Sequence, residues 1–241
     1  MIRNLKALSL ALVAIFAMGA LVAGSASAAG ERFHSETELT ILTGADEPGT
    51  NHVFKSGSLE ITCENATFAG TAKGVKVAEK DYVTTEQTVH PTYTGCSDNV
   101  FGGTDTVDTT GCNYVFKSET NATKHLPAEI ECTAGFAIKV TAPGCTLSFG
   151  AQKNGGGVSV KNEGAGTSRD VTNASTTTAT FTKSGFACGL VAGTTGEYIG
   201  PTTTKGFVDN GVTGNIDEVT AGGADETTIY HEGAQVGIWW Q

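Results

Sequence analysis

Short runs in which apolar and polar residues alternate constrain this chain more than any other feature of its sequence. Successive side chains of a β-strand point to opposite faces, so alternation places every second residue against a core. Residues 59–63, 128–132, 136–141 and 236–240 follow this pattern. After residue 28 we find no run of ten residues with helical periodicity and helix caps, so the sequence predicts an all-β protein.

Glycine-rich segments separate these runs and indicate tight turns. They lie at residues 102–103, 155–157, 164–166, 193–196 and 222–223. Many short strands joined by such turns are typical of two antiparallel sheets packed face to face, or of a small barrel. We therefore predict an antiparallel β-sandwich, with a small β-barrel as the alternative. We expect one all-β domain over residues 38–241, preceded by a flexible tail at residues 29–37.

A threonine-rich run at residues 176–182 shows the same alternation. Its even-numbered positions are all threonine, and Thr177, Ala179 and Phe181 stand between them. Threonine suits strands, and a strand of this kind turns its threonine face to solvent. We expect the even-numbered threonines to be exposed.

The first 28 residues have the organisation of a secretory signal peptide. Arg3 and Lys6 precede an apolar run at residues 7–23, and Ala26 and Ala28 supply the small residues of a cleavage site. The alanine-rich run is typical of bacterial signal peptides. We predict cleavage after Ala28 and a location outside the cell or on the exterior of the cell envelope.

The charge of the exported part is strongly acidic. Once the two basic residues of the signal peptide are removed, 13 basic residues remain against 25 acidic ones. A surface of this sign repels phosphate backbones and anionic lipids. We therefore expect neither nucleic acid nor, after signal cleavage, a membrane as a partner.

All six cysteines lie after the predicted cleavage site. Thiols oxidise outside the cytoplasm, so three disulfides are expected, although six cysteines permit 15 different pairings. The residues that the cysteines bracket favour the pairs Cys96–Cys112, Cys132–Cys145 and Cys63–Cys188. The absence of any C-x-x-C spacing argues against a zinc site.

The cysteine spacing also resembles that of a known set of proteins. Fifteen residues separate Cys96 from Cys112, and 12 separate Cys132 from Cys145. Together with the segments 91–96 and 111–116, this spacing resembles a loose group of uncharacterised secreted β-rich proteins from actinobacteria. The similarity extends over residues 59–149. It implies export, β structure and disulfides, and it implies no activity.

Familiar catalytic motifs are incomplete in this sequence. His231-Glu232 begins the pattern of a zinc-protease helix, but Gln235 occupies the position of the second histidine ligand. Ser97-Asp98-Asn99 matches one element of the serine β-lactamases, and the S-x-x-K and K-T-G elements are missing. We assign no catalytic and no cofactor-binding residue. The missing motifs favour a protein without enzymatic activity, and an enzyme with another kind of site remains the alternative.

Calcium is the one inorganic partner that the sequence suggests. Asp209, Asn215 and Asp217 lie in an acidic segment and carry the hard oxygen ligands that calcium prefers. The spacing matches no EF-hand loop, so a solvated acidic loop is the simpler interpretation.

Two functional hypotheses follow from this sequence. The first is a non-catalytic extracellular or cell-envelope module that acts through its surface, either structurally or by binding an extracellular or cell-wall ligand. The alternative is a secreted hydrolase whose site is assembled from separate loops. A deep pocket that holds His90 or His125 beside two acids would favour the hydrolase.

Overall fold

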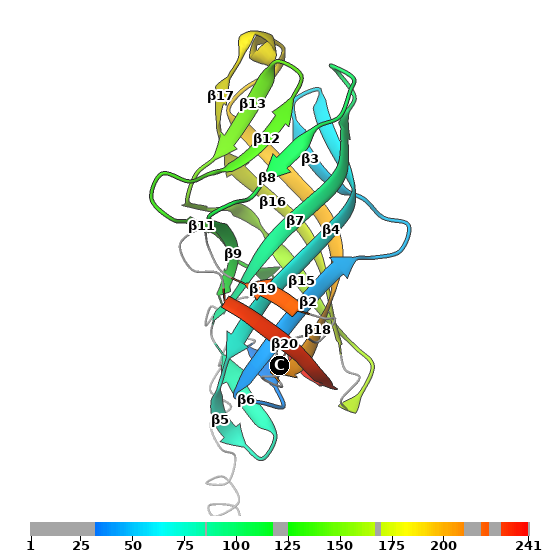
Figure 1. Ribbon diagram of the computed structural model, residues 1–241, viewed down its shortest axis with the longest axis vertical. Helices are drawn as coiled ribbons and strands as arrows, with labels where there is room; N and C mark the ends of the chain where they lie inside the picture. Colours follow the sequence, from blue (N-terminus) through cyan, green and yellow to red (C-terminus); the bar gives the residue numbers. More distant parts are fainter. Residues whose placement is uncertain are drawn as a thin grey trace, which may run out of the picture.

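The computed structural model describes residues 32–84, 86–117, 125–166, 170–209, 218–221 and 228–240 (Figure 1). The elements of this part are antiparallel β-strands and one short 3₁₀ helix, η2 (Phe186–Leu190). The all-β prediction is therefore confirmed. Within the described residues, no helix is long and apolar enough to cross a membrane. The predicted signal peptide, residues 1–28, lies outside them.

The strands form one large sheet and two small ones. The large sheet contains β2 (Leu39–Asp46), β3 (His52–Ser56), β4 (Leu59–Lys73), β7 (Glu86–Asp98), β9 (Cys112–Lys117), β10 (His125–Leu126), β11 (Ala128–Cys132), β14 (Gln152–Lys153), β15 (Gly155–Glu163), β16 (Asp170–Thr180), β18 (Thr195–Asp209), β19 (Glu218–Ala221) and β20 (Thr228–Val236). One small sheet contains β1 (Phe33–Ser35), β5 (Val75–Ala78), β6 (Asp81–Thr84) and β21 (Ile238–Trp240). The other contains β8 (Thr106–Asp108), β12 (Ile138–Ala142), β13 (Cys145–Phe149) and β17 (Thr182–Ser184).

The large sheet curls until its two ends meet. Its path runs β15, β16, β18, β2, β4, β7, β9 and β11, each strand antiparallel to the next. At the junction β11 pairs with β14 and β10 pairs with β15. Only Asn154 separates β14 from β15, and its N–H donates to the carbonyl of Ala128 at 2.9 Å. In the described part of the chain the sheet therefore closes into a barrel of eight strand positions.

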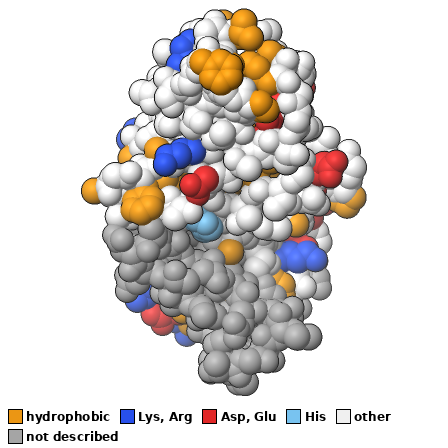
Figure 2. All heavy atoms as spheres, turned by 45° about the horizontal axis from the view of Figure 1, so that its top comes forward, with side chains coloured by type: hydrophobic (Ala, Val, Ile, Leu, Met, Phe, Trp, Pro, Cys, Tyr) orange, Lys and Arg blue, Asp and Glu red, His pale blue; other side chains and the backbone are white. Residues whose placement is uncertain are grey.

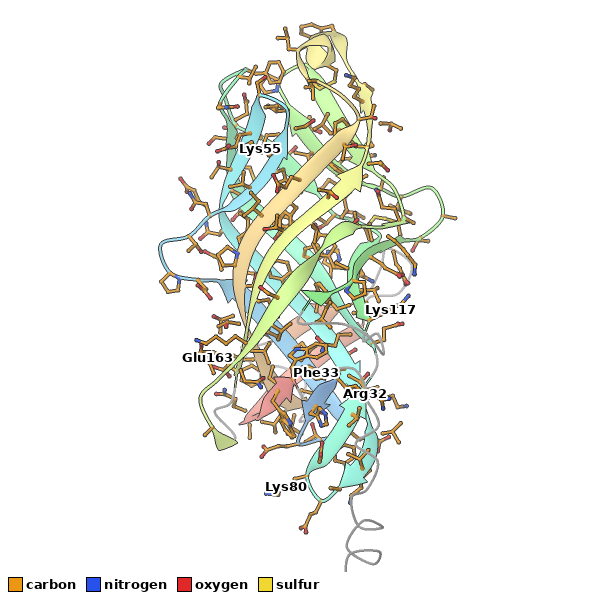
Figure 3. All side chains as sticks on the ribbon, turned by 180° about the vertical axis from the view of Figure 1, so that it is seen from behind. Arg32, Phe33, Lys55, Lys80, Lys117 and Glu163 are labelled. Atoms are coloured by element: carbon orange, nitrogen blue, oxygen red, sulfur yellow. A yellow bond between two sulfur atoms is a disulfide. The ribbon has the colours of Figure 1, made fainter. Side chains whose placement is uncertain are left out.

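This closure corrects the predicted sandwich and agrees with the alternative, a small barrel. Alternation along a strand shows that one face is buried. It does not show whether that face meets a second sheet or the far wall of the same sheet. Figure 1 shows β2, β4 and β7 crossing the front wall, and Figure 3 shows the opposite wall, formed by β15, β16 and β18.

The two small sheets lie at opposite ends of the barrel (Figure 1). The sheet of β1, β5, β6 and β21 lies at the lower end, where the rings of Phe33 and Trp240 meet edge to face with centroids 5.7 Å apart. The sheet of β8, β12, β13 and β17 lies at the upper end with η2. There Phe186 is 95% exposed and Leu190 65% exposed, and Figure 2 shows apolar side chains gathered on this end.

Part of the predicted flexible tail is a strand instead. β1 pairs with β6 on one side and with β21 on the other. Phe33 is buried in the process, with 1% of its surface exposed. Burial of an aromatic ring holds this segment in the fold, and a strand of three residues is too short to show alternation in the sequence.

The structure contains three disulfides, as expected, but all three predicted pairings, Cys96–Cys112, Cys132–Cys145 and Cys63–Cys188, are wrong. The observed pairs are Cys63–Cys96, Cys112–Cys132 and Cys145–Cys188. Three disulfides indicate folding in an oxidising environment, as outside the cytoplasm.

Strand register explains two of the three observed pairs, whereas Cys145–Cys188 joins β13 to η2. Cys63 and Cys96 stand directly opposite each other on β4 and β7, and Cys112 stands opposite Cys132 on β9 and β11. The pairing of β7 with β9 ends at Val89 and Tyr114, before it reaches a cysteine on either strand. The prediction depended on the segments that lie between successive cysteines in the sequence. The length of such a segment carries no information about strand register.

Candidate functional site

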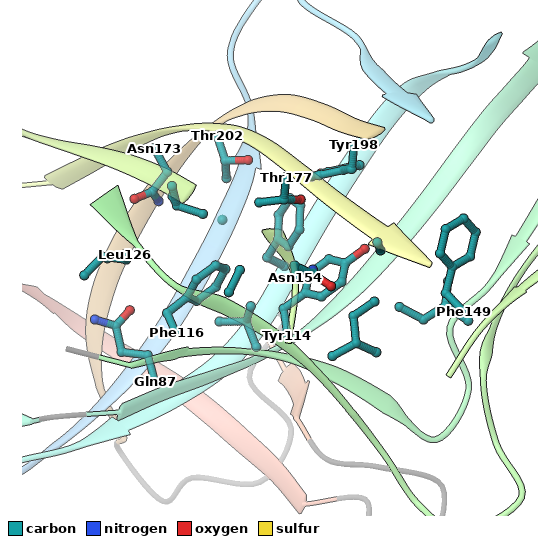
Figure 4. Close-up of a pocket in the computed structure, with 18 of the residues that line it drawn as sticks. Gln87, Tyr114, Phe116, Leu126, Phe149, Asn154, Asn173, Thr177, Tyr198 and Thr202 are labelled. Carbon is teal, nitrogen blue, oxygen red and sulfur yellow. The ribbon is translucent and has the colours of Figure 1, made fainter. Parts of the chain in front are cut away.

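The interior of the barrel holds a cavity of about 80 Å³ (Figure 4). Strands on all sides of the barrel contribute to its wall, because alternate residues of each strand point inward. Most of the wall is apolar and includes Phe54, Phe68, Phe116, Leu126, Ile130 and Val158. The site is therefore a largely apolar chamber in the interior of the barrel.

Polar side chains on β16 and β18 form one part of this wall. Asn173 stands opposite Thr202, and Thr177 stands opposite Tyr198. The Asn173 Nδ2 group donates to Oγ1 of Thr204 at 3.1 Å, so this amide is partly satisfied by its neighbour. Alternation thus places hydroxyl and amide groups on the inner face, whereas Thr176, Thr178, Thr180 and Thr182 are exposed as predicted.

Two further amide side chains in the wall have atoms without a hydrogen-bond partner. Gln87 on β7 is 7% exposed, and within the described residues its Nε2 group donates no hydrogen bond. Asn154, at the junction of β14 and β15, has a buried Oδ1 atom that accepts none in the same part of the chain. Both residues line the cavity (Figure 4). Buried polar groups are nearly always paired, so these two atoms mark positions where a guest molecule can bind.

A chain of buried aromatic side chains adjoins the cavity. The hydroxyl of Tyr93 donates to that of Tyr114 at 3.2 Å. A hydrogen bond of 2.5 Å joins Nδ1 of His52 to the hydroxyl of Tyr198. His52 can lie there because residue 200 is glycine: a Cβ atom on Gly200 would meet the His52 Nδ1 atom at 2.2 Å.

Burial keeps these four aromatic side chains uncharged. It raises the pKa of Tyr93 and of Tyr198 well above the usual value, and it raises the pKa of Tyr114 to about 12. It also lowers the pKa of His52, an effect that the nearby Asp46 carboxylate partly opposes. At neutral pH all four side chains are therefore neutral. The chamber suits an uncharged guest better than it suits proton transfer.

The histidine named for the hydrolase hypothesis lies elsewhere. His90 is on the opposite face of β7 from Gln87 and Val89, and its Nδ1 atom lies 2.9 Å from the carbonyl of Cys112. It is not part of the cavity wall. The side chain of His125 lies outside the described residues.

The candidate calcium ligands are not tested by the structure. Asn215 and Asp217 lie outside the described residues, and so does the side chain of Asp209 at the end of β18. Within the part of the chain that the structure describes, no group of three or more His, Cys, Asp or Glu side chains could hold a metal ion.

A second unusual group is a pair of carboxyl groups near the Cys63–Cys96 disulfide. Asp105 is 3% exposed, and its N–H donates to the carbonyl of Cys96 at 2.9 Å. Burial and the neighbouring Asp98 raise the pKa of Asp105 to about 7. Burial also opposes ionisation of Asp98, but backbone N–H groups of residues 100–102 donate to that carboxylate and leave its pKa lowered. The pair does not line the cavity.

Comparison of the chain with protein-family models, with curated proteins and with solved structures found no match.

Sequence reasoning missed the chamber, although one signal for it was present. Gln87 alternates with Thr88 and His90 and shares its face with Val89 and Tyr93. A polar residue on a buried strand face points either to a structural partner or to a ligand. The signal becomes readable only when the partner strands and their register are known.

Proposed function

We propose that this chain is an exported, non-catalytic binding protein that holds a small molecule inside its barrel. In this proposal residues 1–28 are removed as a signal peptide, and the protein works outside the cell or on the exterior of the cell envelope. The binding module expected from the sequence thus acts through its interior and not through its surface. The observation that carries the proposal is the apolar chamber with the buried Gln87 in its wall, whose Nε2 group has no hydrogen-bond partner among the described residues.

The size of the barrel supports this function. A barrel of about eight strands leaves an interior that either is filled by side chains or holds one small ligand. Here the side chains leave about 80 Å³ unfilled. An engineered apolar cavity of about 150 Å³ binds benzene, so a single-ring molecule fits this chamber if the side chains around it shift modestly.

A cavity-filling substitution tests the proposal. Ala179 lies in the chamber wall on β16, and its neighbour Thr178 is exposed on the outer face of the same strand. We expect saturable binding of one phenol molecule by the mature protein. Ala179→Leu should abolish that binding because the added carbons occupy the chamber, whereas Thr178→Leu should leave it unchanged. Isothermal titration calorimetry measures both.

Retention of the fold is checked by thermal unfolding of each variant, and Ala128→Ile on β11 supplies a second filled chamber if Ala179→Leu does not fold. Phenol binding that survives both filled variants would contradict the proposal, and so would a wild-type protein that does not bind phenol.

A further inference from the structure

We infer that the ligand is an uncharged molecule of about one ring, apolar over most of its surface, with an oxygen atom that accepts a hydrogen bond from Gln87 Nε2. This inference rests on the proposed function and names the class of molecule that the chamber takes.

Gln87 is the first part of the argument. Its side chain is buried, lines the chamber and stands opposite Phe116 in the register of β7 and β9. An apolar residue would fill this position without leaving an amide unpaired, and an unpaired buried amide costs stability. The Nε2 group has no partner among the described residues, so a guest in the chamber is the group that can accept its hydrogen bond.

Asn154 adds a complementary requirement. Its Oδ1 atom, which accepts no hydrogen bond from the described residues, is an acceptor, whereas Gln87 Nε2 is a donor. Gln87 lines the chamber from β7, and Asn154 lines it from the junction of β14 and β15 (Figure 4). A hydroxyl group can accept one hydrogen bond and donate another, so an alcohol or a phenol can pair with either amide.

The charge of the ligand follows from the wall. Among the described residues that line the chamber there is no lysine, arginine or histidine. A carboxylate or phosphate would lose its hydration there with no cation to compensate. Glu197 is the one acid in the wall, and it alternates with the inward-facing Tyr198, so its side chain belongs to the outer face of β18. An ammonium ion would therefore find no counter-ion inside.

The aromatic side chains that line the chamber indicate that the ligand is apolar and about the size of one ring. Phe54, Phe68, Phe116, Tyr114 and Trp240 surround the chamber on several sides. Aromatic side chains pack well against another ring, either offset or edge to face. The small volume limits the guest to about one ring, because larger ligands would displace wall residues that are already closely packed.

Three probes separate these requirements: benzene, phenol and benzoate, titrated by calorimetry at pH 7 against the mature protein. We expect phenol to bind at least about tenfold more tightly than benzene, and we expect no measurable binding of benzoate. In Gln87→Leu, phenol affinity should fall to the level of benzene, whereas benzene affinity should be unchanged. Thr88→Val on the outer face of the same strand is the matched control and should behave as the wild type does.

The outcomes distinguish this inference from the proposed function. If benzene and phenol bind with equal affinity and neither binds Ala179→Leu, the role of Gln87 is overturned, whereas the proposed binding function stands. Benzoate that binds as tightly as phenol would overturn the neutrality requirement. Failure of both benzene and phenol to bind the wild type would overturn the proposed function and the inference together.

Discussion

The buried carboxyl group of Asp105 links the stability of this protein to pH. Its folded-state pKa of about 7 lies above the usual value of 3.8. Between these two values the folded chain holds a proton that the unfolded chain releases. Stability is therefore highest below the unfolded-state pKa and falls as the pH rises through about 7.

Replacing the Asp105 carboxyl by an amide removes the free-energy cost of burying its negative charge at high pH. Asp105→Asn keeps a hydrogen-bond donor beside Asp98 and buries no charge at high pH. We expect the variant to be more stable than the wild type at pH 8 by about 1–3 kcal/mol and to show a flatter stability profile between pH 4 and 8. Chemical unfolding across this range measures both quantities.

Asp108 is the matched control for this change. Its pKa is lowered by hydrogen bonds from the Thr110 side chain and N–H, so the sign of its contribution is opposite. Asp108→Asn should reduce stability at pH 8. A loss of stability at pH 8 in Asp105→Asn as well would contradict the free-energy cost assigned to burying the ionised Asp105 carboxylate.

Only one member of this carboxyl pair carries a local signal in the sequence. Asp98 ends β7 and precedes residues that favour turns, and its carboxylate accepts the N–H groups of the turn that follows. Asp105 lies in a glycine-rich segment of no particular pattern. Its burial depends on an isolated β-bridge to Cys96, and no local sequence pattern predicts that β-bridge.

At the level of strands, inward and outward faces were predictable, but neighbours were not. Leu59, Ile61 and Cys63 share a buried face of β4 as their alternation indicates. Glu129 on β11 points away from the chamber as expected, and its carboxylate pairs with Lys117 at 2.8 Å. Which strand lies beside which, and in what register, depends on closure of the whole sheet. The disulfide pairing was missed for this reason.

Digestion with trypsin under non-reducing conditions tests the strand neighbours directly. The observed pairs predict one product that joins the fragments 56–73, 81–117 and 125–139, because Cys63 binds Cys96 and Cys112 binds Cys132. A second product should join 140–153 to 184–205. Mass spectrometry identifies both. A fragment 56–73 linked to 184–205 would contradict the strand register.

At the scale of the whole molecule, closure of the sheet creates the candidate site. Each strand turns alternate residues inward, and the chamber exists because the eight strand positions surround a space that their side chains do not fill. Gln87 and Asn154 are far apart in the sequence and meet the same chamber only through this closure. Composition and alternation predicted an all-β, disulfide-linked protein. A cavity depends on the difference between the volume of the barrel interior and the volume of the side chains that fill it, and no sequence pattern predicts this difference.

The central claim is that a small neutral molecule binds inside the barrel. Crystals of the mature protein soaked with 4-bromophenol test it most directly, since anomalous scattering locates the bromine atom. We expect a single strong bromine peak inside the barrel, with the phenol oxygen within hydrogen-bond distance of Gln87 Nε2. A map with no interior peak, or with bromine only on the outer wall, would contradict it.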